Sequence, residues 1–178
     1  MSIAALSQSI PGHAKCQPQV DAFFEKRTCS VQYVVSDPAT RCCALVDPVL
    51  DYDEKSGSIA TWSADAFLAF ICDHDVTVEW IFDTHPHAGH FSAAGHLKDR
   101  TGAKTTIGER MVDVQGLWQE IYNLSSTFAA DGSQWDHLVA EGDVFQFGTI
   151  DVRAALCLVR TGSDARVPAQ QTIRGGFY

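Results

Sequence analysis

The feature that most constrains this chain is a cluster of three histidines directly after a short apolar run. The run, residues 76–82, contains β-branched and aromatic side chains and has polar residues at both ends, which predicts a buried β-strand. The cluster follows within residues 84–90, and a helical pattern begins at about His90. The histidines are therefore expected at the edge of a sheet, where layered α/β domains commonly place their sites.

The spacing of the histidines is typical of metal ligands. His85 and His87 are separated by one residue and His90 follows three positions later, so a turning backbone can direct the imidazoles at one point. Neutral imidazole binds zinc, iron and copper, and three histidines can share one or two ions. The alternative is a polar loop that carries histidines without a ligand, but spacing and position together favour a metal site.

The rest of the chain predicts a layered α/β sandwich, because strands and helices alternate after an early hairpin. We expect strands at 29–35, 41–46, 76–82, 104–107, 144–147 and 150–156, and helices at 63–74, 90–101 and 108–122. Residues 20–24 are read as a short helical turn. Residues 51–57 and 123–137 are read as loops, the first of them charged.

Composition restricts the possible partners. A chain of 178 residues is long enough for one domain with a core. The net charge of −9 argues against a nucleic acid or an anionic membrane as a partner. No apolar run has transmembrane length and the N-terminus lacks the pattern of a signal peptide, so we expect a cytoplasmic protein. The six cysteines, which form no C-x-x-C pair, are expected to be reduced and mostly buried.

The histidine cluster resembles the T-H-x-H-x-D-H signature of the metallo-β-lactamase fold. Residues 46–53, 102–104, 107–110 and 131–133 are similar to the glyoxalase II-like branch, and within it to persulfide dioxygenases. The resemblance covers about residues 28–153 and implies the N-terminal half of an αββα sandwich. It divides the chain into a lead-in (1–28), a partial metallo-β-lactamase-like domain (29–156) and an irregular tail without family likeness (157–178).

The resemblance implies a zinc or iron cofactor and a small-molecule thiol or thioester substrate. His85 and His87 match the first two motif ligands of the zinc hydrolases, and His90 matches the motif histidine that serves the second metal. Of the His-His-Asp set that binds iron in the persulfide dioxygenase-like branch, only His85 is carried over. Gly89 stands where the family has an aspartate. The motif assigns no catalytic residue in this chain.

The metal site is therefore expected to be incomplete and to bind its ion weakly. Three protein ligands are usual for a catalytic zinc, and a third would have to come from His137, Asp83 or Asp136. We expect Asp83 to hydrogen-bond near the motif loop instead. Two functions stay open: a metal-dependent hydrolase or persulfide dioxygenase-like enzyme, or a non-catalytic half-domain.

The non-catalytic alternative includes truncation or a frameshift. One possible set of codons for residues 161–167, read one base later, encodes Pro-Gly-Gln-Thr-Pro-Ala-Cys, which looks like the family's P-G-H-T-P turn with Gln in place of the ligand histidine. This match is the basis of the frameshift hypothesis. A half-sheet would also leave an apolar face and a strand edge exposed, which predicts self-association.

Overall fold

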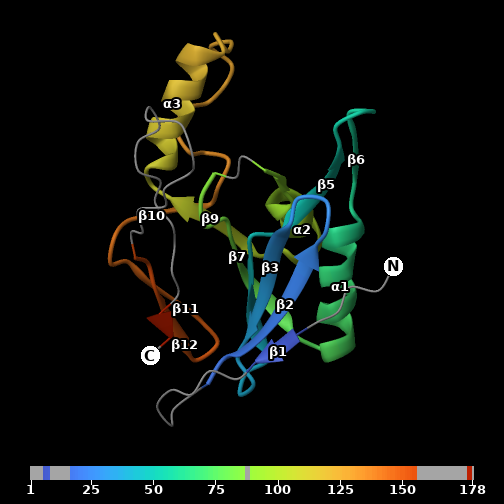
Figure 1. Cartoon of the computed structure of the whole chain (residues 1–178). Helices are drawn as coiled ribbons and strands as arrows, with labels where there is room; N and C mark the ends of the chain where they lie inside the picture. Colours follow the sequence, from blue (N-terminus) through green and yellow to red (C-terminus); the bar gives the residue numbers. More distant parts are fainter. Residues whose placement is uncertain (1–5, 9–16, 87–88, 156–175, 178) are drawn as a thin grey trace.

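A mixed seven-stranded sheet forms the centre of the computed structural model, which describes residues 6–8, 17–86, 89–155 and 176–177 (Figure 1). In spatial order its strands are β1 (Leu6–Gln8), β2 (Gln19–Glu25), β3 (Ser30–Ser36), β4 (Cys42–Val46), β7 (Thr77–Phe82), β9 (Lys104–Gly108) and β10 (His137–Val139). The strands from β1 to β4 pair antiparallel, whereas β4, β7, β9 and β10 are parallel. The parallel strands bring the segments that follow β4, β7 and β9 to one edge.

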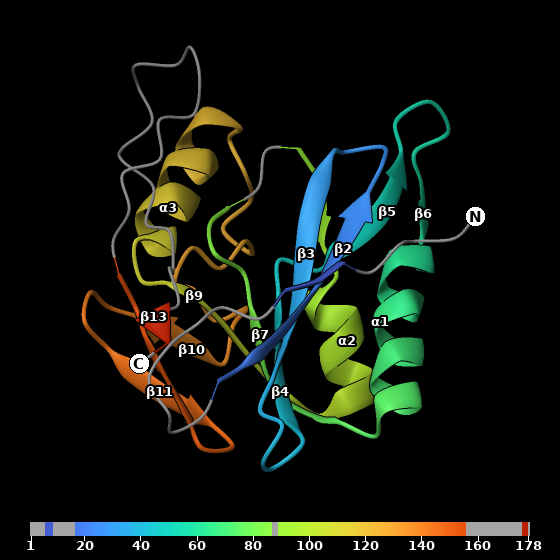
Figure 2. The same cartoon turned by 60° about the horizontal axis from the view of Figure 1, so that its bottom comes forward.

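Two small sheets and three helices complete the described structure. The small sheets consist of β5 (Val49–Asp53), β6 (Ser58–Ala60) and β8 (Phe91–Ser92), and of β11 (Val144–Phe147), β12 (Ile150–Arg153) and β13 (Gly176–Phe177). Helices α1 (Trp62–His74) and α2 (Ala94–Thr101) lie side by side along one face of the large sheet, and the β11–β12 hairpin lies across the other face (Figure 2). Helix α3 (Met111–Ile121) follows β9 and packs against it through Met111 and Val114. None of the described helices is long and apolar enough to cross a membrane.

Both faces of the large sheet are buried at its centre. Successive side chains on a strand point to opposite faces, so each central strand contributes to two cores. In β4, Cys43 and Leu45 pack with the residues of α1 and α2, while Ala44 packs with the β11–β12 hairpin. In β7, Ile81 faces the helices and Phe82 faces the hairpin, with its ring 5.0 Å from the ring of Phe145. The near-continuous apolar sequence of residues 76–82 reflects this burial on both faces.

Asp37 attaches the β11–β12 hairpin to the large sheet. Its carboxylate lies in the turn after β3 and accepts hydrogen bonds from the backbone N–H and the hydroxyl of Thr149, both at 2.7 Å. Gly148, in the same hairpin turn, has a φ of 54°, and a Cβ at this position would overlap Thr40 and Asp37. Trp80 donates from Nε1 to the carbonyl of Gln146 at 3.1 Å. These contacts fix the second layer on the first.

The structure confirms most of the expected elements and corrects four of them. The helix expected at 90–101 begins only at Ala94, because Phe91 and Ser92 pair with β5 as strand β8. Residues 20–24 belong to strand β2, so the expected helical turn is wrong; all seven residues of β2 pair with β3, which outweighs the local pattern. The expected charged loop at 51–57 begins with the end of β5, and the expected loop at 123–137 ends in β10. Strand β2 lies inside the segment 1–28 that the sequence separates as a lead-in. Most of the tail, including residues 161–167, lies outside the described residues.

Candidate metal centre

The histidine segment begins where β7 ends, at the edge shared by the parallel strands. The end of β7 is held by Asp47, the residue directly after β4. The backbone N–H of Asp47 bonds to the carbonyl of Phe82 at 2.8 Å, and its carboxylate accepts the N–H and the hydroxyl of Thr84, both at 2.7 Å. Asp47 has a φ of 51°, a left-handed conformation that aspartate tolerates better than most residues. The first residue of the segment is thus fixed through both its backbone and its side chain.

His85 is positioned by this pair. Its Nδ1 lies 2.9 Å from the hydroxyl oxygen of Thr84. A threonine hydroxyl has one hydrogen, and here it is donated to the carboxylate of Asp47, which can only accept. The contact with His85 therefore uses the Nδ1–H of the imidazole. In this tautomer the lone pair is on Nε2, the state of a histidine that binds metal through Nε2.

His90 is held from the opposite side of the segment. Its Nδ1 lies 3.0 Å from the hydroxyl oxygen of Ser30, the first residue of β3. His90 is half-buried, and it lines a pocket of about 560 Å³ beside the β5–β6 hairpin. His87 lies outside the described residues, so the structure does not test the three histidines as a set. It does tie two of them to hydroxyl groups through Nδ1.

The pocket beside His90 carries side chains that the sequence motif did not point to. Its lining includes Arg27, Tyr52, Lys55 and Gly89. Arg27 forms an ion pair with Asp53 at 3.1 Å, and both side chains are well exposed. The ring of Tyr52 packs edge-on against Phe91, with centroids 4.9 Å apart. The volume of the pocket is in the range of small-molecule sites. Nothing in the local sequence marks these lining residues as part of a site.

The three residues considered as a further metal ligand are all placed by other contacts. Asp83 is buried and accepts hydrogen bonds from the hydroxyl of Ser92 at 2.7 Å and from Nε1 of Trp135 at 2.9 Å. It thus bonds Ser92 of β8, two residues after the histidine segment.

Asp136 and His137 lie further along the sheet. Asp136 accepts from Lys98 and from the N–H and hydroxyl of Thr105, and these bonds lower the pKa of its carboxyl to about 2 although burial opposes them. His137 is exposed and its ring lies against the edge of Trp80. Across the described residues, which leave out His87, no three His, Cys, Asp or Glu side chains converge on a metal position.

Gly89 leaves room for a side chain at the position where the family carries aspartate. It is exposed, and a Cβ added there would meet no heavy atom within 4 Å. Its backbone is not among those with a positive φ. Neither space nor conformation therefore requires glycine at this position, and what the glycine changes is the supply of carboxylate oxygens beside His90.

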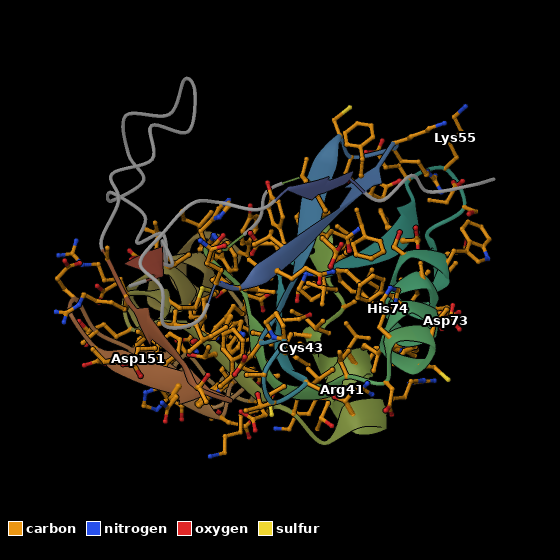
Figure 3. All side chains as sticks on the ribbon, turned by 90° about the horizontal axis from the view of Figure 1, so that it is seen from below. Arg41, Cys43, Lys55, Asp73, His74 and Asp151 are labelled. Atoms are coloured by element: carbon orange, nitrogen blue, oxygen red, sulfur yellow. The ribbon has the colours of Figure 1, made fainter. Side chains whose placement is uncertain are left out.

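The cysteines do not add to the candidate site. Cys43 is fully buried between the large sheet and α1, where Figure 3 shows it among packed side chains, and burial raises the pKa of its thiol to about 12. Cys29 and Cys72 are exposed, so the expectation of mostly buried cysteines is wrong for two of the four that are described. All four are free thiols.

The donors present suit a zinc or iron ion in kind. Two imidazoles whose Nδ1 atoms are held by hydroxyl groups match the way metal-binding histidines are normally oriented by their surroundings. The described residues include two of the three predicted ligands, His85 and His90. The fit is one of donor chemistry, because the third histidine is not described.

Comparison with known proteins gives the family. No protein-family model matches the chain. It is 60% identical over 136 residues to a β-lactamase hydrolase-like protein of Xylella fastidiosa (strain 9a5c), and 42% identical over 135 residues to a probable metallo-hydrolase of Burkholderia pseudomallei (strain 1710b). Each alignment covers 76% of this chain. Among solved structures, ETHE1 from Myxococcus xanthus is 27% identical with a TM-score of 0.54, over 76% of this chain and 46% of that one.

The chain belongs to the metallo-β-lactamase fold superfamily. These relatives support its glyoxalase II/ETHE1-like branch, so the resemblance seen in the sequence is confirmed. The expected fold class is confirmed as well, as a partial αββα domain. The chain spans 31% of the length of the Xylella relative and 46% of the length of the Burkholderia relative. The names of these relatives, a β-lactamase hydrolase-like protein and a probable metallo-hydrolase, describe the longer proteins.

Proposed function

We propose that this chain carries the histidine part of a metal centre, with His85, His87 and His90 as ligands of zinc or iron. The observation that carries the proposal is the link from Asp47 through Thr84 to Nδ1 of His85, with distances of 2.7 and 2.9 Å. Such a link fixes both the tautomer and the orientation of an imidazole, and metal-binding histidines normally have one. The proposed whole-protein activity is that of a metal-dependent hydrolase or a persulfide dioxygenase-like enzyme acting on a small thiol or thioester.

A bound ion would polarise a substrate oxygen and activate water. The chain's own residues would do three things. Thr84 and Asp47 would keep the lone pair of His85 on Nε2. Asp83 would hold β8, next to the segment, against Trp135. The pocket lined by Tyr52, Lys55 and His90 would receive the substrate.

We also propose that metal binding by this chain is weak. Asp83 and Asp136 are engaged with Ser92, Trp135, Thr105 and Lys98, and Gly89 supplies no carboxylate. A non-catalytic half-domain is the second candidate function. It is favoured by the same lack of an available carboxylate near the histidines. The two candidates differ in whether the ion stays bound and whether it turns over a thioester.

The test is a zinc and iron titration of protein first stripped of metal with a chelator. We expect binding that His85→Ala and His90→Ala each reduce, and less than one ion per chain after dialysis. His74→Ala is the matched control, because this histidine lies at the end of α1 (Figure 3), where its Nδ1 bonds to the carbonyl of Phe70 at 2.9 Å. Binding unaffected by either histidine variant would refute the metal centre. A full ion per chain after dialysis, with thioester hydrolysis, would refute the weak-binding and non-catalytic proposals.

A further inference from the structure

His90 ends a chain of three polar side chains from the β2–β3 hairpin. The hydroxyl oxygen of Ser30 lies 3.0 Å from Nδ1 of His90 and 2.9 Å from the hydroxyl oxygen of Thr28. The Thr28 hydroxyl lies 2.6 Å from Oε2 of Glu25. Ser30 and His90 are 60 residues apart in sequence. The hairpin therefore reaches the histidine segment through this chain of contacts.

The first link can be assigned because Glu25 is ionised. Its carboxylate also accepts the backbone N–H groups of Arg27 and Thr28, at 2.8 and 2.7 Å. Burial alone would raise the pKa of Glu25, but these bonds and that of the Thr28 hydroxyl outweigh it and lower the pKa. An ionised carboxylate can only accept hydrogen bonds. The 2.6 Å contact therefore contains the hydrogen of the Thr28 hydroxyl.

The remaining links follow from counting hydrogens. The Thr28 hydroxyl is within donating distance of both Glu25 and Ser30, but it has only one hydrogen, and the charged carboxylate is the stronger acceptor. The contact between Thr28 and Ser30 must then use the hydrogen of Ser30, since two oxygens without a hydrogen between them would repel. With that hydrogen committed, the Ser30 oxygen can only accept from His90, so the contact at 3.0 Å uses the Nδ1–H of the imidazole.

We propose that Glu25, Thr28 and Ser30 are positioning residues that hold His90 in its Nδ1–H tautomer and keep the lone pair on Nε2. His85 is held in the same tautomer by Thr84 and Asp47. Two histidines of the segment thus have the same tautomer, each fixed by a different set of residues. The assignment of the tautomer stands on these three contacts and on the ionised carboxylate of Glu25, and it needs no bound metal. The role of Nε2 as a metal ligand rests on the proposed function.

The decisive measurement is the tautomer of His90 in metal-free, ¹⁵N-labelled protein, read from two-bond ¹H–¹⁵N correlations of the imidazoles at a pH where they are neutral. The signals are assigned with His90→Gln. We expect the Nδ1–H pattern in the wild type. Thr28→Val, which keeps the shape but removes the hydroxyl, should shift His90 toward the other tautomer, and Thr28→Ser should restore it. Ser58→Ala is the control, because Ser58 is an exposed serine whose hydroxyl bonds only locally, to Ser56 at 2.8 Å.

Two outcomes would refute the positioning role of Glu25, Thr28 and Ser30. One is an Nε2–H pattern for His90 in the wild type, and the other is a wild-type pattern in Thr28→Val. The first needs no variant to fold. A parallel zinc titration tests the positioning role of these residues separately from the proposed metal centre. We expect Thr28→Val to lower zinc affinity by about 10- to 100-fold, the usual effect of removing a partner of a metal-binding histidine. A tautomer shift without a change in zinc affinity would show that these residues position His90 but that His90 does not bind the metal.

Discussion

Thr84 and Thr105 are two residues with the same hydrogen bonds but different neighbours. Each donates its backbone N–H and its hydroxyl to one aspartate, Asp47 for Thr84 and Asp136 for Thr105. The oxygen of Thr84 also contacts Nδ1 of His85. Thr105 bonds no histidine but accepts the backbone N–H of Asp136 at 3.2 Å. The pair therefore separates the structural effect of a threonine–aspartate contact from its effect on an imidazole.

We predict that Thr84→Val lowers zinc affinity by about 10- to 100-fold, because the acceptor that fixes the tautomer of His85 is lost. Calorimetric titration of metal-free protein measures this change. Thr84→Val and Thr105→Val should each lower the free energy of unfolding in urea by about 1–3 kcal/mol. Only Thr84→Val should lower zinc affinity. Equal losses of affinity in both variants would assign the effect to general destabilisation.

Gly89→Asp should be tolerated and should strengthen metal binding without creating activity. The added side chain enters open space next to His90, so zinc affinity should rise by at least about tenfold from a new carboxylate. Thioester hydrolysis should stay absent, since one added carboxylate does not by itself make a weak metal site catalytic. Gly95→Asp on α2 is the control, because it adds the same charge at another exposed glycine with open space. Thioester turnover by Gly89→Asp would show a more complete site than we propose.

At this scale the sequence predicts which residues matter but not what holds them. The spacing of His85, His87 and His90 and their position after a buried strand are local patterns, and the structure places His85 three residues after the end of β7. Their partners are not local: Asp47 is 37 residues from Thr84, and Ser30 is 60 residues from His90. Only the order of strands in the sheet brings these groups together, and no pattern within one segment encodes that order.

Among the elements, the β11–β12 hairpin depends on one buried carboxylate. Asp37 is fully buried and accepts hydrogen bonds from Thr149, Thr40 and Ala39. Burial raises the pKa of Asp37, but these bonds outweigh it and lower the pKa to about 2. Because the pKa is lower in the folded chain, this group stabilises the fold at pH values above the unfolded value of 3.8, and the contribution is lost as the pH falls toward about 2.

Asp37→Asn should therefore cost about 2 kcal/mol of folding free energy near neutral pH, the equivalent of the pKa shift. The cost should shrink as the pH falls from about 5 to about 2.5, because the wild-type carboxyl then becomes protonated. Urea unfolding of both proteins across this range measures the difference. Asp151→Asn, an exposed aspartate on β12 of the same hairpin (Figure 3), is the control. A cost that does not depend on pH would contradict the role of the Asp37 charge.

The elements that the sequence predicts well are those with a strong pattern of their own. The strand at 76–82, the helix of α3 and the hairpin at 144–153 are of this kind. The helical turn expected at residues 20–24 lies within strand β2, whose pattern mixes a buried aspartate, Asp21, with the adjacent aromatic residues Phe23 and Phe24. Pairing with β3 along its whole length decides its structure. The same applies to β10, a three-residue strand fixed by its parallel partner β9.

At the scale of the whole molecule, the described residues cover one face of the large sheet only in part. Over β4 and β7 the β11–β12 hairpin buries Ala44 and Phe82. On the same face of β2 and β3, Phe24, Val31 and Tyr33 stay exposed, at 47%, 41% and 36%. They face the hairpin side because Val20 and Val35, at alternate positions of the same strands, pack with its core. Exposed apolar groups that adjoin a buried core are typical of surfaces that associate.

We therefore predict that the purified chain self-associates through this face, and that Val31→Lys makes it more monomeric. Val31 lies opposite Phe24 in the β2–β3 register, so one lysine places a charge in the middle of the exposed group at little cost to the core. Sedimentation velocity over a range of concentrations measures the shift. The matched control is Ile59→Lys, which changes an apolar side chain of 64% exposure on β6, outside this face. A wild-type chain that stays monomeric at all concentrations and binds no hydrophobic dye would contradict the prediction. An equal effect of Ile59→Lys would show that reduced net negative charge or general solubility, and not this face, controls the association.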